Sequence, residues 1–257
     1  LQLPAAQAAQ LREQAAALGV TPACLFHVMW AQVLAQVCNQ MQQVVFGTVL
    51  AGRSVAGTQA MLGLLINTLP LVVELAGRDA RSVVQQTQQR LSELMAHEHA
   101  PLTLAQQASP LPAAQPLFSS ILNFRHSSAN QLDWPGMQVL AGQERTHYPL
   151  TVNIDDLGHD FVLNLQLLPG SAVGAEQVLA YCETAMQALL ADLRSDLSHA
   201  PMPATAALTR HGILPPHELA ALHAFNATGD DLLAGYACNL TLPQLIELQA
   251  SMAPDAV

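Results

Sequence analysis

The chain has 257 residues, of which 51% are hydrophobic and 11% are charged, and its formal net charge is −10. A chain of this size can bury a sizeable core in one or two domains, and its few charges argue against disorder. The acidic balance and the lack of a Lys/Arg cluster exclude a nucleic-acid-binding class, because that binding requires cations to neutralise phosphates.

The sequence also argues against a membrane protein or an exported one. No apolar run reaches the ~18 residues that span a bilayer, and the N-terminus lacks the basic-then-apolar layout of a signal peptide. The cysteines form no C-x-x-C pair, so we expect reduced thiols in a cytoplasmic protein. Because the chain begins with Leu rather than Met, we treat it as a piece of a longer protein. The cysteines are Cys24, Cys38, Cys182 and Cys238.

Two helices are expected at the start of the chain. The stretch Ala5–Leu18 is rich in Ala and Gln, and a Gly follows it, which suits a helix C-terminus. Thr21-Pro22 is an N-cap followed by Pro at the first helical position, and the second helix runs to about Asn39. His27 and Trp30 flank its apolar stripe and are interpreted as packing or surface residues. The stripe consists of Leu25, Phe26, Met29, Val33, Leu34 and Val37.

The stretch Val44–Leu75 organises the rest of the chain. Its two β-type runs, Val44–Leu50 and Thr68–Leu75, predict strands on either side of a glycine-punctuated connection. The polar pair Asn67-Thr68 interrupts an apolar run. Burying such a pair without hydrogen-bond partners costs roughly 1–3 kcal/mol per group, so we expect it to line an aqueous passage. Alternatively, Asn67 only caps or turns the chain before the strand.

Helices are also predicted over Asp79–His97 and Ala175–Arg194, where apolar residues repeat at helical spacing. Between them, Ala100–Pro116 is rich in Pro and Ala and is interpreted as an irregular crossing. Leu117–Phe124 is predicted to be a strand, and Met137–Ala141 a short one. The apolar stripe of the first of these two helices is Val83, Val84, Thr87, Leu91, Leu94 and Met95.

The alternating pattern over Leu150–Leu168 predicts a hairpin with a turn at Asp156–His159. The adjacent acidic pairs Asp155-Asp156 and Asp230-Asp231 are interpreted as solvated turn residues. Prolines then interrupt the chain beyond Leu197, which indicates a linker. A further helix is expected near the end, over Leu242–Gln249.

No familiar constellation of catalytic or metal-binding residues stands out. The serines lack the G-x-S-x-G nucleophile elbow, and no Gly-rich phosphate loop precedes a helix. His97 and His99 are two residues apart, so on a helix they point to nearly opposite sides and cannot share a metal. The sequence therefore predicts no catalytic residue and no metal ligand in this chain.

Four sequence motifs follow one another along the chain. They are the AGR element Ala51–Arg53, the G-x-hydrophobic-x-N-T-x-P-L run Gly63–Leu71, the H-x-x-x-P-hydrophobic run His97–Leu102, and the strand Leu117–His126. Together they resemble the second half of the condensation domains of nonribosomal peptide synthetases, and the resemblance covers about Leu11–Leu197.

The resemblance implies an α/β lobe with a chloramphenicol acetyltransferase-like fold, a mixed β-sheet covered by helices. In that family two lobes form a V around an active-site tunnel, and the catalytic H-H-x-x-x-D-G motif ends the first lobe. This sequence has no adjacent His pair and no His with H-x-x-x-D spacing. The chain would therefore form the acceptor wall of a tunnel where a peptide bond is made, without the catalytic half, and would be inactive alone.

The resemblance also implies that a segment crosses over to complete the sheet of the partner lobe. The hairpin Leu150–Leu168 and the strand at Leu117 are the two candidates. Either one would leave an unpaired strand edge in this chain, which is an aggregation hazard.

The same resemblance assigns roles to individual residues. Asn67 and Thr68 are expected to line the tunnel, and so are Asn123 and Arg125, where a strand changes from apolar to polar residues. Arg53 is expected to hold a carboxylate that fixes the lobe junction or, alternatively, to form a surface salt bridge.

Three further residues belong to the structural part of these motifs. They are Gly63, His97 and Pro101. His97 is assigned a structural role at a helix C-terminus, where a cation is favoured.

The implied organisation is a condensation-domain lobe at 1–198, an interdomain linker at 199–240 and the start of an adenylation domain at 241–257. The implied partners are the N-terminal lobe, the adenylation domain and peptidyl carrier proteins. No cofactor is expected to bind directly, since the substrates arrive on the carriers' 4′-phosphopantetheine arms. The sequences of the motifs at His97 and Leu117 resemble the subgroup that both epimerises the upstream residue and condenses it more than they resemble the plain L-to-L subgroup.

Two alternatives stay open from the sequence. The chain could be a non-catalytic module that docks carrier proteins or neighbouring domains. It could also be half of a CoA-dependent acyltransferase outside peptide synthesis, although the linker-like tail argues against that class.

Overall fold

The computed structural model describes residues 1–39, 41–53, 57, 61–112, 115–126, 144, 146–171, 173–196, 212–227 and 240–254. The chain divides into two units, Leu1–Ile213 and Leu214–Val257. The described part of the second unit contains helices α6 (Pro216–Asn226) and α8 (Leu242–Met252). The helix predicted over Leu242–Gln249 is thus confirmed as part of α8.

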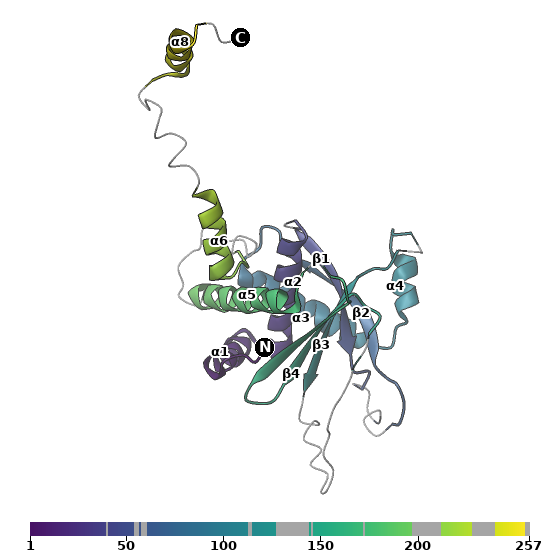
Figure 1. The fold of residues 1–257 in the computed structure, drawn as a ribbon. Coiled ribbons are helices and arrows are strands. Elements are labelled where there is room, and N and C mark those ends of the chain that lie inside the picture. Colours follow the sequence, from purple (N-terminus) through teal and green to yellow (C-terminus); the bar gives the residue numbers. More distant parts are fainter. Residues whose placement is uncertain are drawn as a thin grey trace. The chain divides into compact units, whose positions relative to one another are not determined.

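The first unit is built on a five-stranded mixed sheet in the order β2-β1-β3-β4-β5 (Figure 1). The outer pairs, β1–β2 and β4–β5, are antiparallel, whereas β3 pairs in parallel with β1 and β4. The hairpin and the two strands of the central stretch are confirmed. The strands are β1 (Gln43–Leu50), β2 (Asn67–Glu74), β3 (Ser120–His126), β4 (Leu150–Asp156) and β5 (Phe161–Leu167).

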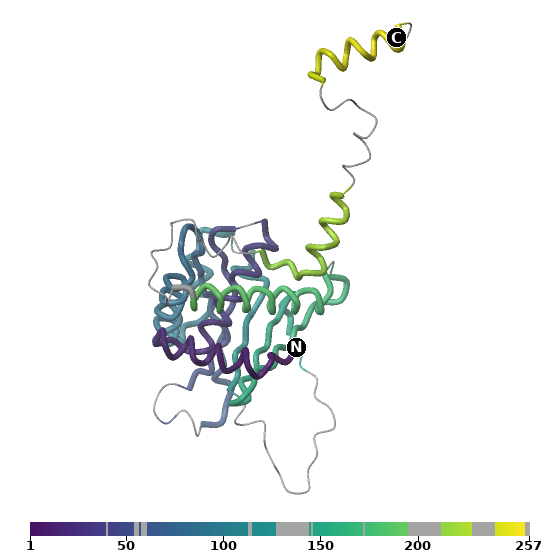
Figure 2. Tube along the Cα trace, turned by 90° about the vertical axis from the view of Figure 1, so that its left-hand side faces the viewer, coloured from purple at the N-terminus to yellow at the C-terminus, as the bar shows by residue number. Residues whose placement is uncertain are grey.

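Helix α2 lies at the centre of the unit, against β1 and β3 and beneath the other helices. Helices α1 and α5 run across this side of the sheet (Figure 2). Thr21 caps α2 by accepting a hydrogen bond from the backbone N–H of Cys24, as the N-cap pattern predicts. The helices are α1 (Ala5–Leu18), α2 (Pro22–Val37), α3 (Ala80–Ala96), α4 (Leu102–Ala108) and α5 (Ala175–Asp196).

Burial of α2 goes beyond the predicted stripe. Every residue from Cys24 to Val33 is buried, because the sheet covers one side of the helix and other helices cover the rest. His27 and Trp30 are therefore core residues rather than surface ones. At the end of the stripe, Val37 is 53% exposed, so its predicted burial was wrong.

Helix α3 follows its predicted stripe for most of its length. Val83, Val84, Thr87 and Leu91 are buried, whereas Met95, near the end of the helix, is 50% exposed and lies outside the core. Apolar spacing predicts the buried face but not where the neighbouring elements stop covering it.

Two cysteines belong to the core. Cys24 and Cys182 are buried free thiols, and burial raises the pKa of each to about 12, so both stay protonated and inert at neutral pH. Cys38 is free and exposed, and Cys238 lies outside the described residues.

Three expectations about the middle of the chain need correction. The crossing at Ala100–Pro116 contains a helix, α4, which contacts β2. The strand expected at Leu117–Phe124 begins at Ser120 and ends at His126. That strand is the centre of the sheet, and the hairpin pairs with it, so neither crossover candidate leaves this unit. The short strand expected at Met137–Ala141 lies outside the described residues.

Both edges of the sheet are partly occupied. On the β2 edge, Pro70 has no N–H, and the carbonyl of Val72 accepts a hydrogen bond from Arg90 Nη1 of α3 at 2.5 Å. On the β5 edge, Gln2 forms an antiparallel bridge with Val162. Both crossover candidates are strands of this sheet. The unpaired edge that a crossover would leave is therefore not seen.

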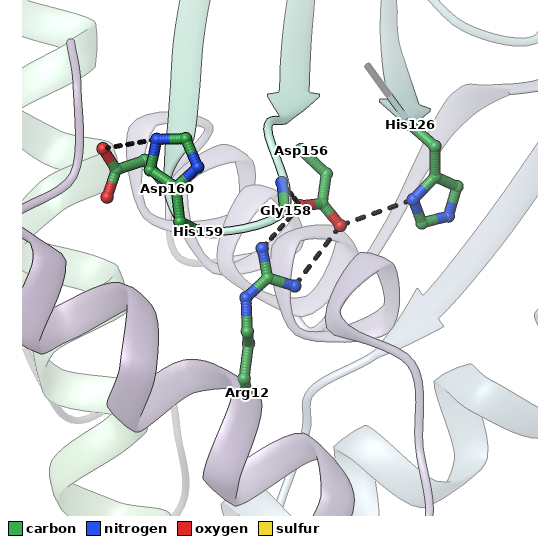
Figure 3. A network of polar contacts seen from close by, with 6 residues as sticks. All are labelled: Arg12, His126, Asp156, Gly158, His159 and Asp160. Atoms are coloured by element: carbon green, nitrogen blue, oxygen red, sulfur yellow. Dashed lines mark hydrogen bonds and ion pairs between the residues drawn. The ribbon is translucent and has the colours of Figure 1, made fainter. Parts of the chain in front are cut away.

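An ion pair joins α1 to the end of β4 (Figure 3). The guanidinium of Arg12 contacts both carboxylate oxygens of Asp156, at 2.5 and 3.4 Å, and stacks 4.2 Å above the ring of Phe161. The backbone N–H of Gly158 donates to the same carboxylate at 3.0 Å, and His126 Nδ1 lies 3.4 Å from it.

The solvated-turn interpretation of Asp155-Asp156 was therefore wrong. Both residues are in β4, and the Asp156 side chain is only 6% exposed. Burial alone would raise the pKa of Asp156, but the hydrogen bonds and charges of its partners outweigh burial and lower it. The pair Asp230-Asp231 lies outside the described residues.

No single described helix is long and apolar enough to cross a membrane. Helices α1 and α2 reach that length and composition only as a pair that is bent by 105° at its break.

We expect Asp156→Asn to lower the free energy of unfolding by about 1–3 kcal/mol, because it removes the charge that pairs with Arg12. Urea unfolding of the 257-residue chain measures the effect. The matched control, Arg78→Gln, breaks the half-exposed pair with Glu74 and should cost less than about 1 kcal/mol. Equal losses in the two variants would contradict the assigned role.

The contribution of Asp156 should also depend on pH. Because its pKa is lowered on folding, its stabilisation is complete above the unfolded value of about 3.9 and disappears as the pH falls through the folded value. The stability difference between wild type and Asp156→Asn should therefore shrink below about pH 4. A difference that did not shrink at all as the pH fell further would show that the charge is not its cause.

Candidate functional site

A groove of about 390 Å³ lies at the carboxyl ends of the parallel strands β1 and β3. In open α/β sheets, ligands bind in the crevice beyond the carboxyl ends of parallel strands. The start of α2 and the end of α3 complete its walls. Its lining residues are Thr21, Ala23, His27, Thr48, Val49, Leu50, Ala51, Arg53, Gln88, Leu91, Met95, Glu98, Phe124 and His126.

A buried His–Thr pair lies in the wall of this groove. His27 Nε2 is 2.7 Å from the hydroxyl of Thr48, and His27 Nδ1 is 2.7 Å from the carbonyl oxygen of Ala23, one turn earlier in α2. His27 is 3% exposed and Thr48 is 2% exposed. Burial lowers the pKa of His27 to about 4, so the imidazole is neutral at physiological pH.

Arg53 lies at the mouth of the groove, where a glycine fixes the chain path. Gly52 has a φ of +66°, and a Cβ there would be 1.9 Å from the carbonyl oxygen of Leu65, so only glycine fits. Arg53 Nη1 donates to the carbonyl of Met61 at 3.2 Å. The contact links two residues of the connection between β1 and β2, and the predicted carboxylate partner of Arg53 stays a prediction.

Asn67 bonds to the backbone at the end of α3. Its Nδ2 donates to the carbonyls of Glu98 and Ala100, at 2.8 and 2.7 Å, and its Oδ1 accepts from the backbone N–H of Thr68 at 2.9 Å. These bonds hold the start of β2 against the turn that follows α3. Asn67 thus has the chain-fixing contacts of the alternative interpretation, and it is not among the residues that line the groove.

Thr68 lies on the opposite face of the sheet from Asn67. It pairs with Val49 of β1, whereas its neighbour Leu69 is buried toward the helices. Thr68 is also not among the groove residues. Its role in lining a tunnel stays a prediction.

Asn123 and Arg125 share that second face of the sheet. Asn123 Nδ2 donates to Asn153 Oδ1 at 3.1 Å, and Arg125 forms two bonds to Asp155, at 2.8 and 3.0 Å. The strand therefore does not leave the core at these residues. Its polar positions pair with β4, while Phe124 packs toward the helices.

Two carboxylates keep Arg125 charged. Besides Asp155, Glu144 accepts a hydrogen bond from Arg125 Nη1 at 2.8 Å. Burial disfavours the charged guanidinium, but the two carboxylates outweigh it and raise the pKa of Arg125. A substrate carboxylate would have to compete with these existing pairs.

The remaining motif residues lie at helix ends and in a loop. His97 is the C-cap of α3 and is exposed, and Pro101 is the N-cap of α4. Gly63 has a φ of +149°, which suits glycine, in an exposed loop. His97 and His99 lie beyond the end of α3, and the described residues contain no cluster that could hold a metal.

Sequence reasoning missed four residues of the groove. The sequence analysis interprets His27 as a packing or surface residue, places His126 only at the end of a strand motif, and gives Thr48 and Glu98 no role. One signal was available: Thr48 is a polar residue on the otherwise apolar inward face of β1, which includes Val44 and Phe46. Nothing in the sequence alone places it beside a helix 21 residues earlier.

We expect Asn67→Ala to lower the free energy of unfolding by about 1–3 kcal/mol, because two backbone carbonyls and one backbone N–H lose their partner. Urea unfolding measures the loss, and amide hydrogen exchange should show faster exchange at Thr68. Asn164→Ala, at an exposed position of β5, is the matched control and should have little effect. An unchanged stability in Asn67→Ala would contradict the chain-fixing role.

The condensation-domain family matches residues 1–203 of the chain. Malpinin synthetase and malpibaldin synthetase, both from Mortierella alpina, are 42% and 36% identical to it over 99% and 100% of its length. A linear gramicidin synthase from Brevibacillus parabrevis is 31% identical over 88%. The chain spans only 3 to 4% of these relatives.

Solved structures share the fold at low sequence identity. A four-domain nonribosomal peptide synthetase bound to AMP and glycine matches 85% of this chain with a TM-score of 0.62 and 18% identity, over 18% of its own length. The first condensation domain of the CDA synthetase matches 82% of this chain with a TM-score of 0.58 and 17% identity, over 46% of its length. The predicted α/β fold is confirmed, and the chain belongs to the condensation-domain family.

Proposed function

We propose that this chain forms the C-terminal half of a condensation domain in a nonribosomal peptide synthetase. In this proposal it shapes the acceptor side of a tunnel in which a peptide bond forms between two carrier-bound substrates. The amine of the acceptor aminoacyl thioester attacks the carbonyl carbon of the donor thioester. The carbon–sulfur bond breaks, and the donor thiol leaves with the proton that the amine gives up.

One observation carries the proposal. The groove opens at the ends of two parallel strands, in a chain that matches less than half of a solved condensation domain. The sequence has no H-H-x-x-x-D-G motif, so the base or positioning histidine has to come from the other half. What this half can supply is orientation, which is worth roughly 7–11 kcal/mol when two reactants are held in near-attack geometry.

The residues of the groove suit that role. Its walls combine apolar side chains with polar groups that would orient a thin substrate arm. Arg53, at the mouth, would hold a carboxylate of the other half across the junction. Asn67, Thr68, Asn123 and Arg125 would line the tunnel, with Asn67 beside the turn after α3 and the other three on the second face of the sheet.

The proposed partners follow from the same reading. They are the N-terminal lobe, a downstream adenylation domain, and peptidyl carrier proteins whose 4′-phosphopantetheine arms enter the tunnel.

The proposed boundaries, with a lobe at 1–198, a linker at 199–240 and the start of an adenylation domain at 241–257, are supported by a family match that ends at residue 203. Cytoplasmic location and membership of the epimerising subgroup also stay proposals.

The test is reconstitution from two halves. The purified chain is mixed with a loaded donor carrier and a loaded acceptor carrier, with or without the N-terminal lobe of the same synthetase, and dipeptidyl thioester is followed by mass spectrometry. We expect product only when both halves are present, because the catalytic motif and the groove lie on different halves.

The intact domain is the positive control, and Arg78→Gln, in the ion pair with Glu74 at the end of β2, is a neutral variant of this chain. Product from the chain alone would overturn the shared-tunnel proposal and would redirect attention to the histidines of the groove. No product from the two halves, with an active intact domain, would favour the docking-module alternative.

A further inference from the structure

The hydrogen bonds of His27 determine which of its nitrogens carries the proton. Nδ1 lies 2.7 Å from the carbonyl oxygen of Ala23, and a carbonyl can only accept, so Nδ1 carries the hydrogen. The neutral ring then has a bare Nε2 that can only accept. Its partner, 2.7 Å away, is the hydroxyl of Thr48, which therefore donates its hydrogen to the histidine.

This bond leaves Thr48 with acceptor capacity only. A hydroxyl has one hydrogen and two lone pairs, and the hydrogen is already committed. Thr48 lines the groove, and within the described part of the chain no other side chain or backbone group is bonded to its hydroxyl. His27 itself is held by the bond to Ala23 and by stacking against Phe46, with ring centroids 6.0 Å apart.

We propose that Thr48, oriented by His27, is a positioning residue that accepts a hydrogen bond from an N–H group of the substrate in the groove. The neighbouring lining residues Val49, Leu50, Leu91 and Phe124 are apolar. An N–H that enters such a setting without a partner pays a desolvation cost. A fixed acceptor at Thr48 removes that cost for one N–H and penalises a competing acceptor.

This inference rests on the proposed function for the identity of the ligand. In that reaction two kinds of N–H reach the tunnel, the amide of a phosphopantetheine arm and the amine of the acceptor amino acid. The shared chemistry is a hydrogen-bond donor on nitrogen. Two probes separate the sources: N-acetylcysteamine, which has the terminal amide and thiol of the arm, and glycine ethyl ester, which has an amine but no amide.

The first measurement tests the orientation of the pair and needs no ligand. Nitrogen-15 NMR of the 257-residue chain should show His27 with a protonated Nδ1 and an unprotonated Nε2 at pH 7. The opposite tautomer would overturn the proposal, because Thr48 would then have to accept from the histidine.

The second measurement tests recognition by NMR titration. Thr48→Val should weaken binding of one of the two probes about fivefold, because the isosteric side chain lacks the acceptor, and that probe identifies the source of the N–H. Thr48→Ser should bind within twofold of wild type. The matched control is Thr87→Val, which alters a buried threonine of α3 that is not among the groove residues.

Two further arms separate positioning from simple packing. N-acetyl-N-methylcysteamine has no N–H, so wild type and Thr48→Val should bind it equally. His27→Phe keeps a ring beside Phe46 but removes the acceptor that orients Thr48, and it should weaken binding of the N–H probe about threefold. Thermal unfolding of each variant confirms that the comparison is made on folded protein.

The outcomes differ from those of the reconstitution assay. If Thr48→Val binds both N–H probes as tightly as wild type, the positioning role is overturned, even if the two halves make dipeptide. If the tautomer and the loss of binding are observed but no dipeptide forms, the N–H site stands and the proposed reaction fails.

Discussion

Helix α2 is enclosed by the sheet on one side and by the other helices elsewhere, and this enclosure constrains the rest of the first unit. A helix with no solvated face has to be apolar nearly throughout, and a polar group on it is costly to bury without a partner. His27 meets this requirement with one bond inside its own helix and one to β1. His27 and Thr48 thus satisfy each other's hydrogen bonding in the core, and the same two residues lie in the wall of the groove.

Most of the fold could be predicted because its elements carry clear periodicities. The hairpin β4–β5 alternates with period two, and α1 and α3 carry caps or stops where their patterns end. Helix α4 could not be predicted because prolines surround a short helix that has no buried residue and hence no apolar stripe against the core. Exposure at the ends of α2 and α3 could not be predicted, since it depends on where neighbouring elements stop.

The site was harder to predict than the fold, and the reason is physical. Asn67, Asn123 and Arg125 look like binding residues in the sequence because each is polar beside apolar residues. In the structure each is bonded to another segment: Asn67 to the turn after α3, Asn123 to Asn153, and Arg125 to Asp155. A polar residue in an apolar strand shows that a partner is needed, but not whether the partner is a substrate or the protein itself.

Asp156 shows the same limit of prediction from sequence, here for a residue that was expected to be solvated and is buried. In the sequence it is one of two acids before a Gly, which is typical of a solvated turn, and Gly158 does bond to it. The strand continues to Asp156, however, and α1 brings Arg12 to it from 144 residues away. The turn at Gly158 was predicted correctly, whereas the exposure of the Asp156 carboxylate was not. The contact that buries this carboxylate joins segments far apart in the chain.

The occupied edges of the sheet have a consequence for how such a chain is synthesised. In relatives many times longer than this chain, a domain of this kind emerges from the ribosome with much more polypeptide attached to it. Neighbouring domains that fold at high local concentration can misassemble by pairing strand to strand. Pro70 and the Arg90 bond to Val72 on one edge, and the bridge of Gln2 to Val162 on the other, occupy part of the backbone that such pairing would use. The same local contacts that finish the sheet thus also reduce the strand backbone that is open to exchange with another domain.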